Sequence, residues 1–324
     1  MKDLWVRKGF VDEPVDSHVN LVDGIRELLK KKNAVILAHY YQDSDIQDIA
    51  DFVGDSLDLS RRAADADADI ILFAGVHFMA ETAKILSPGK KVLIPDRMAG
   101  CSLADSCPPD EFAAFRNEHP DHMVVTYVNT SAAIKALSDV CCTSTNALQI
   151  IQHIPEKQKI IFAPDRNLGN YLNSLTGRDM LVWDGACHVH EEFSLEKILL
   201  LKNEYPEARI ICHPECTKPI RIVSDFIGST SALLNFSKTD PGETYIVATE
   251  SGILHQMKKA SPDKLFIPAP PKDSTCACND CKFMKLHNLK KIYNTLKYEW
   301  PEVTVPEDIR KRAEIPIRRM LEWS

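Results

Sequence analysis

The sequence predicts an α/β fold: three similar parallel-sheet α/β domains with a shared central site. Two observations carry this prediction. Short apolar runs alternate with helical patterns as far as about residue 270, and polar residues recur at near-constant offsets just after those runs. The chain has 324 residues, of which 44% are hydrophobic and 26% charged. That composition and length are ordinary for a globular protein of two or three domains.

The alternation begins with a helical pattern at 21–32, followed at once by an apolar run at 33–38. A run that is apolar on both faces is typical of a strand buried in a parallel sheet. Further strands are expected at 70–74, 92–94, 123–128, 159–163, 180–183, 208–212, 244–248 and 265–267. Helical patterns such as 80–86 and 195–204 lie between them. This order predicts parallel sheets with helices on their faces.

The two ends of the chain differ from this pattern. Residues 1–19 show no clear periodicity and are expected to form an arm, and after residue 281 only helical patterns remain, at 286–296 and 306–323. We therefore expect α/β repeats at 20–108, 109–194 and 195–283. A helical tail at 284–324 should pack back onto an earlier domain.

Three classes of residue recur once in each repeat. The first strand of each repeat ends at His39, Tyr127 and His213. A small hydroxyl residue follows 17 positions later, at Ser56, Ser144 and Thr230. A cysteine comes next, at Cys101, Cys187 and Cys281. Because open parallel sheets bind ligands at the carboxyl ends of their strands, these residues are expected to meet at one central site.

The three cysteines predict a metal group with an open coordination position. Three thiolates are one fewer than a closed zinc site or a four-cysteine cluster uses. A 4Fe-4S cluster with one free iron fits this count, and the free iron would act as a Lewis acid on substrate. The alternative is a local zinc site at Cys276, Cys278 and Cys281, with His287 as the nearest further ligand.

The other cysteines compete less well as ligands. Cys107, close after Cys101, is the strongest competitor among them. The remainder flank predicted strands and are expected to be core thiols: Cys141, Cys142, Cys212 and Cys216.

Acid–base groups are expected at the same level as the cysteines: His39, Tyr41, Tyr127, His190, His213 and Glu215. A histidine can both accept and donate protons near neutral pH, and Glu215 can act as a base or orient His213. Asn129 can hydrogen-bond a carboxylate or an imine. The remaining histidines considered lie on helical or surface patterns and are expected to be structural: His77, His119, His122, His153 and His255.

Ser56, Ser144 and Thr230 each stand where a helix should begin, as an N-cap would. Three helix N-termini that converge on one cavity would attract a multiply anionic substrate.

Composition limits the partners. The net charge is −7, without a basic stripe, so neither nucleic acid nor an anionic membrane is favoured. The first residues contain no apolar signal segment, and no apolar run approaches the roughly 18 residues of a membrane span. Ten cysteines then indicate the reducing cytoplasm. Small anionic molecules are the expected partners.

Specific motifs also resemble those of one family, the bacterial and archaeal quinolinate synthases. The matching stretches include ILAHYYQ, GDS, FAGVHFMAETAKIL, AGCSLAD, TYVNTSAAIKA, CTSTNA, GACHVH, HPEC and GSTSAL. They run in family order from about residue 33 to Met284. One departure is that some members carry C-x-x-C-x-x-C before the Met, whereas this chain has C-x-C-x-x-C.

The resemblance implies three α/β domains around a pseudo-threefold axis, with an oxygen-sensitive 4Fe-4S cluster at the centre. It implies a transferase of de novo NAD biosynthesis that condenses iminoaspartate with dihydroxyacetone phosphate to quinolinate, releasing phosphate and water. The cluster ligands would be Cys101, Cys187 and Cys281, the last favoured by the Met that follows it. An enzyme that supplies unstable iminoaspartate would be a partner.

The resemblance also implies which residues bind substrate: His39, Ser56, Tyr127, Asn129, Ser144, His213, Glu215 and Thr230, with Tyr41 and His190 nearby. The competing hypothesis is a non-catalytic, anion-binding iron-sulfur sensor. Such a sensor would need no tyrosines or Glu215 beside its pocket.

Overall fold

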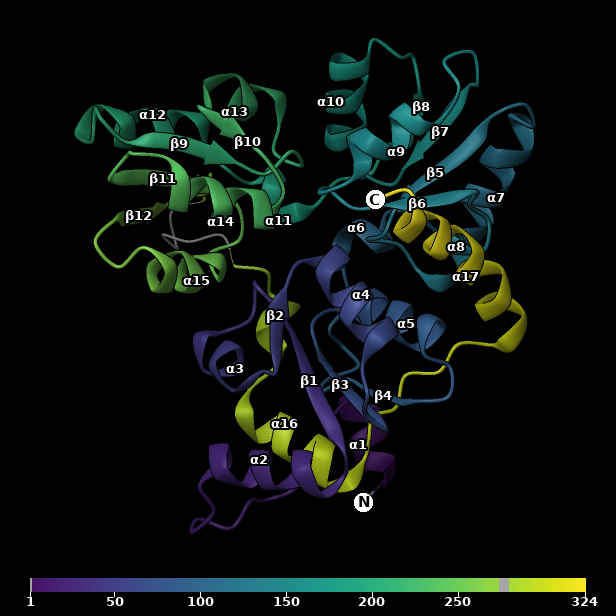
Figure 1. Ribbon diagram of the computed structural model, residues 1–324, viewed down its shortest axis with the longest axis vertical. Helices are drawn as coiled ribbons and strands as arrows, with labels where there is room; N and C mark the ends of the chain where they lie inside the picture. Colours follow the sequence, from purple (N-terminus) through teal and green to yellow (C-terminus); the bar gives the residue numbers. More distant parts are fainter. Residues whose placement is uncertain (1, 274–279) are drawn as a thin grey trace.

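Three parallel sheets of four strands form the framework of the molecule, and they lie around a common centre (Figure 1). The structure is a computed structural model that describes residues 2–273 and 280–324. The strand orders are β2-β1-β3-β4, β6-β5-β7-β8 and β10-β9-β11-β12, so the first strand of each unit has the same place in its sheet. We call the units built on these sheets the first, second and third domain. The predicted fold class is confirmed.

The first domain buries both faces of its sheet. Its strands are β1 (Ala34–His39), β2 (Phe52–Gly54), β3 (Ile70–Ala74) and β4 (Lys91–Leu93). Its helices are α2 (Leu21–Lys31), α3 (Ser44–Ile49), α4 (Ser56–Asp65), α5 (His77–Leu86) and α6 (Ser102–Asp105). Ile71 and Phe73 of β3 pack into one apolar cluster, and Leu72 and Ala74 into another. This two-sided burial explains why the strand is a continuous apolar run.

The second domain repeats this arrangement. Its strands are β5 (Met123–Tyr127), β6 (Val140–Cys142), β7 (Ile160–Ala163) and β8 (Leu181–Val182). Its helices are α7 (Pro109–Glu118), α8 (Ala132–Lys135), α9 (Ala147–His153), α10 (Arg166–Thr176) and α11 (His188–Glu191).

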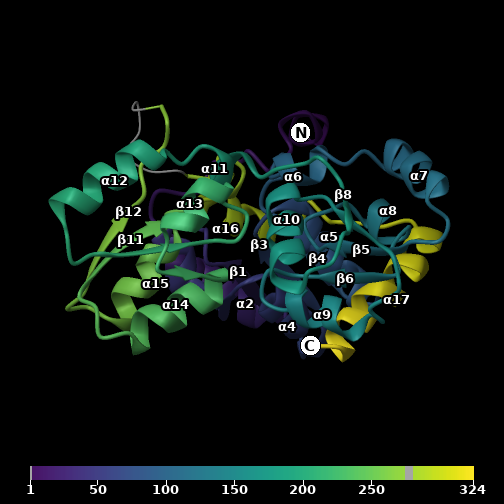
Figure 2. The same ribbon diagram turned by 90° about the horizontal axis from the view of Figure 1, so that it is seen from above.

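The third domain has the same arrangement of strands and helices, and it lies opposite the second domain when the molecule is seen from above (Figure 2). Its strands are β9 (Arg209–Cys212), β10 (Phe226–Ile227), β11 (Thr244–Ala248) and β12 (Leu265–Pro268). Its helices are α12 (Leu195–Glu204), α13 (Lys218–Val223), α14 (Thr230–Thr239) and α15 (Ile253–Ala260).

Each sheet contains one edge strand that the sequence did not predict: β2, β6 and β10. Strands β2 and β10 offer only two apolar residues before a glycine, and two of the three residues of β6 are cysteines. The edge strands β4 and β8 are equally short, but the apolar runs at 92–94 and 180–183 indicated them. Strands β2, β6 and β10 each pair in parallel with the first strand of their domain, and Gly54 lies opposite His39 while Cys142 lies opposite Tyr127. This register brings the residues that follow both strands to the same edge of the sheet.

The first part of the expected N-terminal arm is helical. Helix α1 (Lys2–Lys8) buries a single residue, Trp5, whose ring lies 5.2 Å from that of Tyr298 and 6.0 Å from that of Trp300. One buried position produces no apolar period, which explains why the sequence did not reveal this helix.

The C-terminal segment contacts two domains. It contains a 3₁₀ turn, η1 (Met284–Leu286), and two helices, α16 (Leu289–Tyr298) and α17 (Glu307–Glu322). Helix α16 packs against α2, and α17 packs against α8, β6 and α5 (Figure 1).

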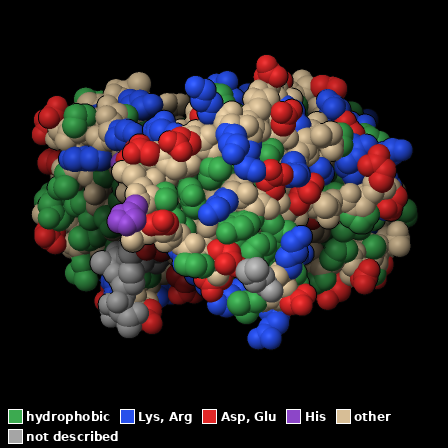
Figure 3. Space-filling model, turned by 90° about the horizontal axis from the view of Figure 1, so that it is seen from below, with side chains coloured by type: hydrophobic (Ala, Val, Ile, Leu, Met, Phe, Trp, Pro, Cys, Tyr) green, Lys and Arg blue, Asp and Glu red, His purple; other side chains and the backbone are tan. Residues whose placement is uncertain are grey.

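Charges of both signs are interspersed on the face seen from below (Figure 3). Among the described residues, no helix combines the length and apolar character needed to cross a bilayer.

Candidate active site

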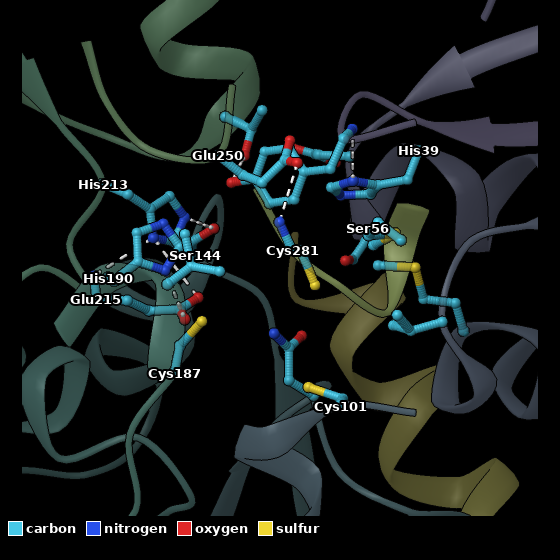
Figure 4. Close-up of a pocket in the computed structure, with 18 of the residues that line it drawn as sticks. His39, Ser56, Cys101, Ser144, Cys187, His190, His213, Glu215, Glu250 and Cys281 are labelled. Carbon is cyan, nitrogen blue, oxygen red and sulfur yellow. Dashed lines mark hydrogen bonds and ion pairs between the residues drawn. The ribbon is translucent and has the colours of Figure 1, made fainter. Parts of the chain in front are cut away.

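A central cavity lies where the carboxyl ends of strands from all three sheets meet (Figure 4). Its empty volume is about 620 Å³, which includes open solvent at its mouth. Every residue singled out from the sequence as a site residue lines it: His39, Tyr41, Ser56, Cys101, Tyr127, Asn129, Ser144, Cys187, His190, His213, Glu215, Thr230 and Cys281. The structure therefore brings the whole predicted set together.

Three cysteine thiols face the same space in this cavity (Figure 4). Burial, together with the neighbouring Cys281, raises the pKa of Cys101 to about 12. Burial and the nearby Glu215 and Cys101 raise the pKa of Cys187 well above its usual range, and burial raises that of Cys281. Three thiolates would repel one another here unless a cationic group bound all of them. The donor set therefore fits a metal cluster that keeps one position open.

The other cysteines that the structure describes do not line the cavity. Cys107 packs with Phe112 in a separate apolar cluster. The expected core thiols are fully buried: Cys141, Cys142, Cys212 and Cys216. Cys276 and Cys278, which the local zinc alternative requires, lie outside the described residues. His287, its fourth ligand, is buried, and its Nε2 lies 2.7 Å from the carbonyl oxygen of Gly75.

The carboxylate of Glu215 is the centre of a buried polar group. The Tyr127 hydroxyl donates a hydrogen bond to its Oε1 at 2.6 Å, and Nδ1 of His190 lies 3.3 Å from its Oε2. Burial by itself would raise the pKa of Glu215, but His190, His213 and the Tyr127 hydroxyl hold it below its usual range. The side chain is therefore an ionised proton acceptor at neutral pH.

A second donor set overlaps the thiols at this point. A sulfur of Cys187, a ring nitrogen of His190 and a carboxylate oxygen of Glu215 lie within 4.8 Å of one another. Glu215 and His190 thus stand beside Cys187 in the cavity.

Two histidines are oriented in the same way by the backbone that follows them. Nδ1 of His39 accepts a hydrogen bond from the backbone N–H of Tyr41 at 3.2 Å, and Nδ1 of His213 accepts one from that of Glu215 at 3.3 Å. Burial lowers the pKa of His39 to about 4 and that of His213 to about 3. Both rings are therefore neutral at pH 7. With Nδ1 as an acceptor, Nε2 carries the proton and is the donor.

Ser56, Ser144 and Thr230 line the cavity, but they are not the helix N-caps that their positions suggested. Asp55 caps α4 and Ser229 caps α14, each one residue earlier, and α9 begins three residues after Ser144. The prediction was wrong because polar residues stand side by side at these positions, and only backbone geometry decides which one caps. Two of these hydroxyls contact cavity residues instead: that of Ser144 lies 3.1 Å from Nε2 of His213, and that of Thr230 lies 2.9 Å from the Tyr41 hydroxyl.

A chain of hydrogen bonds links the three domains across the cavity. The Tyr41 hydroxyl lies 2.9 Å from Oγ1 of Thr230 and 2.7 Å from Oγ1 of Thr249. Thr249 in turn lies 3.0 Å from Nε2 of His190. Burial raises the pKa of Tyr41 well above its usual range, so its hydroxyl keeps its proton and can donate it along this chain.

Two buried polar atoms of lining residues lack a hydrogen-bond partner among the described residues, Nδ1 of His190, which faces Glu215, and Oδ1 of Asn129. Leaving such an atom unpaired costs about 1–3 kcal/mol, so a ligand group that donates to Oδ1 of Asn129 would bind with advantage.

Glu250 is a lining residue that the sequence analysis did not find. Its buried Oε1 accepts the backbone N–H of Cys281 at 3.2 Å and lies 3.1 Å from Nζ of Lys285, and its Oε2 accepts the N–H of Gly252 at 2.7 Å. Burial raises its pKa to about 7. Glu250 lies two residues after strand β11, and Val76 lies at the equivalent position after β3. Because the repeats do not share a residue class at this position, the repeat pattern did not indicate Glu250.

The fold and the site define a class of protein: an enzyme in which thiols and acid–base groups from three α/β domains meet in one cavity. The family model described as Quinolinate synthetase A protein matches residues 23–322. The chain belongs to that family.

Similar proteins cover nearly the whole chain. The quinolinate synthase of Thermosynechococcus vestitus is 58% identical over 306 residues, which are 94% of this chain and 96% of that protein. The quinolinate synthase of Nostoc punctiforme is 60% identical over 306 residues, 94% of each chain. That of a Synechocystis species is 59% identical over 305 residues, 94% of this chain and 96% of that protein.

Proposed function

We propose that this protein is a quinolinate synthase that condenses iminoaspartate with dihydroxyacetone phosphate, releasing phosphate and water, in NAD biosynthesis. The observation that supports the proposal is that three thiols, an ionised carboxylate and neutral histidines line one cavity. Because iminoaspartate is unstable, a neighbouring enzyme that oxidises aspartate would supply it. The cysteines that the structure describes form no disulfide bonds, which supports a location in the reducing cytoplasm.

Cys101, Cys187 and Cys281 would hold a 4Fe-4S cluster. Three thiolates leave one iron open, and the bound cluster would supply Lewis-acid polarisation of a substrate carboxylate or hydroxyl. The raised pKa of these thiols supports the assignment, because cationic iron offsets the cost of burying thiolates.

The substrates are anionic, and the lining offers neutral donors for them. The proposed binding residues are His39, Ser56, Tyr127, Asn129, Ser144, His213, Glu215 and Thr230. Nε2–H of His39, the Asn129 amide and the hydroxyls can donate to carboxylate and phosphate oxygens. Donors from three separate domains would hold both substrates in one orientation, which lowers the entropic part of the barrier.

Glu215 is the proposed base for carbon–carbon bond formation. It would take a proton from the carbon next to the imine of iminoaspartate, which gives the enamine. The enamine carbon then attacks the triose, and phosphate leaves. His213, neutral and carrying its proton on Nε2, would donate to the oxygen on which charge develops.

Tyr41 and Tyr127 would handle the keto–aldehyde isomerisation and ring closure. Burial raises the pKa of both hydroxyls well above the usual range, so both stay protonated at neutral pH and would act as hydrogen-bond donors to the reacting oxygens. His190 lies between Glu215 and Thr249 and would carry a proton from the base towards Tyr41.

Anaerobic purification, iron and sulfide analysis, and a quinolinate assay test this function. About four irons per chain and formation of quinolinate are expected. Cys187→Ser should remove both the cluster absorbance and turnover, whereas Cys141→Ser, a core thiol, should keep both. Full activity of Cys187→Ser would contradict the ligand assignment. Four irons without product would favour the sensor.

A further inference from the structure

The side chain of Asp55 joins all three domains. Its Oδ1 accepts the backbone N–H groups of Leu57 and Asp58, at 3.0 Å each, and so caps helix α4 of its own domain. Its Oδ2 accepts the hydroxyl of Thr145 in the second domain and that of Ser231 in the third, each at 2.7 Å. The side chain is buried. One carboxylate therefore makes a local cap and two bonds between domains.

Each partner of Asp55 is next in sequence to a hydroxyl that lines the cavity. Asp55 precedes Ser56, Thr145 follows Ser144, and Ser231 follows Thr230. Neighbouring Cα atoms are only about 3.8 Å apart. A shift of one domain that broke a bond to Asp55 would therefore also displace one of the three lining hydroxyls.

The three repeats carry different residues at the position of Asp55. The residues that match Asp55 are Thr143 and Ser229, because Gly54-Asp55-Ser56 corresponds to Cys142-Thr143-Ser144 and Gly228-Ser229-Thr230. Ser229 accepts the N–H of Ala232 within its own domain, at 3.3 Å. A hydroxyl oxygen has two lone pairs, whereas a carboxylate has about four acceptor sites. Only the carboxylate can cap its own helix and also bind two further hydroxyls.

We propose that Asp55 is a positioning residue that holds the three domains so that Ser56, Ser144 and Thr230 face the same anionic group of the substrate. This inference rests on the proposed function. Asp55 acts through the segments that carry these hydroxyls, and it does so in the protein before substrate binds. Its negative charge is matched by four hydrogen-bond donors.

Thr145→Val and Ser231→Ala test the bonds between domains, because both leave the cap of α4 intact. Each should raise about tenfold the KM of the substrate whose anionic group these three hydroxyls face. The kcat should change little, since bound substrate and transition state lose the same contacts. In an Asp55→Ala background, Thr145→Val should have no further effect. Unchanged KM in both variants, or fully additive effects with Asp55→Ala, would overturn the proposal.

A matched control separates positioning from capping. Asn20 caps α2 through the N–H groups of Val22 and Asp23, as Asp55 caps α4, and α2 does not border the cavity. Asn20→Ala should lower thermal stability and leave KM unchanged. Asp55→Asn keeps a cap and can donate to hydroxyl oxygens. Its KM should therefore lie between that of the wild type and the higher KM of Asp55→Ala.

Hydrogen–deuterium exchange of the substrate-free protein gives a result that does not depend on quinolinate synthesis. Residues 143–148 and 229–234 should exchange faster in Asp55→Ala and unchanged in Asn20→Ala. Equal exchange in Asp55→Ala and the wild type would refute the positioning role. Faster exchange without any quinolinate formed by the wild type would keep the role and refute the proposed function.

Discussion

Tyr127→Phe is the sharpest test of Glu215 as the base. Tyr127 is 4% exposed, and its hydroxyl lies 2.6 Å from Oε1 of Glu215, so the substitution removes a short donor from a buried carboxylate. A hydrogen bond to a charged group contributes about 1.5–3 kcal/mol. That range corresponds to about 1–2 units in the pKa of Glu215, in the upward direction. The acid limb of the kcat/KM–pH profile should therefore move upward by the same amount, because the free enzyme must lose a proton from Glu215 before this side chain can act as a base.

The assay is the anaerobic initial rate of quinolinate formation, with iron content and urea unfolding measured on the same samples. Tyr127 is also the proposed donor in ring closure, and the loss of that contact, which forms only with substrate bound, should lower kcat/KM at pH 7 about tenfold or more. Tyr245→Phe is the matched control, because its buried hydroxyl donates to Oδ2 of Asp240 at 2.8 Å away from the cavity. It should lose stability but keep its activity. Wild-type kcat/KM in Tyr127→Phe would refute the reasoning.

Three further predictions concern stability and iron binding. Burial lowers the pKa of His287 to about 4, so this group binds more protons in the unfolded chain between about pH 4 and 6.5, and its contribution to stability should rise by up to about 3 kcal/mol across that window. Because His39 and His213 contribute in the same direction, His287→Gln should reduce the slope seen in urea titrations by about that amount and leave the rest. Gly185→Ala would place a Cβ 2.5 Å from the backbone oxygen of Pro164, and it should lower the free energy of unfolding by about 1–3 kcal/mol, measured by thermal unfolding. Gly89→Ala is the control, because its Cβ would meet nothing within 4 Å, and it should leave the free energy of unfolding unchanged. Glu250→Ala removes the acceptor of the Cys281 N–H and should speed loss of iron to a chelator; bleaching at the wild-type rate would contradict that role.

The central strands could be predicted because burial on both faces requires a continuous run of apolar residues, which is visible in the sequence. Strands β3 and β11 match the expected ranges, since a strand covered on both faces must be apolar throughout. The edge strands β2, β6 and β10 were not predicted, because β2 and β10 offer only two apolar residues before a glycine and β6 consists mainly of cysteines. What identifies them is pairing with a distant strand.

The sequence by itself determined the repeat, and with it the residues that meet in the cavity. The regular offsets of His39, Tyr127 and His213 place polar residues at equivalent strand ends, and parallel sheets collect such ends at one edge. This local rule was enough to bring three cysteines from separate domains to a common site.

Tertiary structure alone decided how those residues are held. The bonds of Asp55 to Thr145 and Ser231 join residues 90 and 176 positions apart, and the bond of Glu250 to the Cys281 N–H joins residues 31 apart. No local sequence pattern predicts such contacts: those of Asp55 depend on how the domains face one another, and that of Glu250 depends on how a distant segment of the same repeat packs against it. The physical reason is that a hydrogen bond requires donor and acceptor within about 3 Å, a distance that only the packed domains establish.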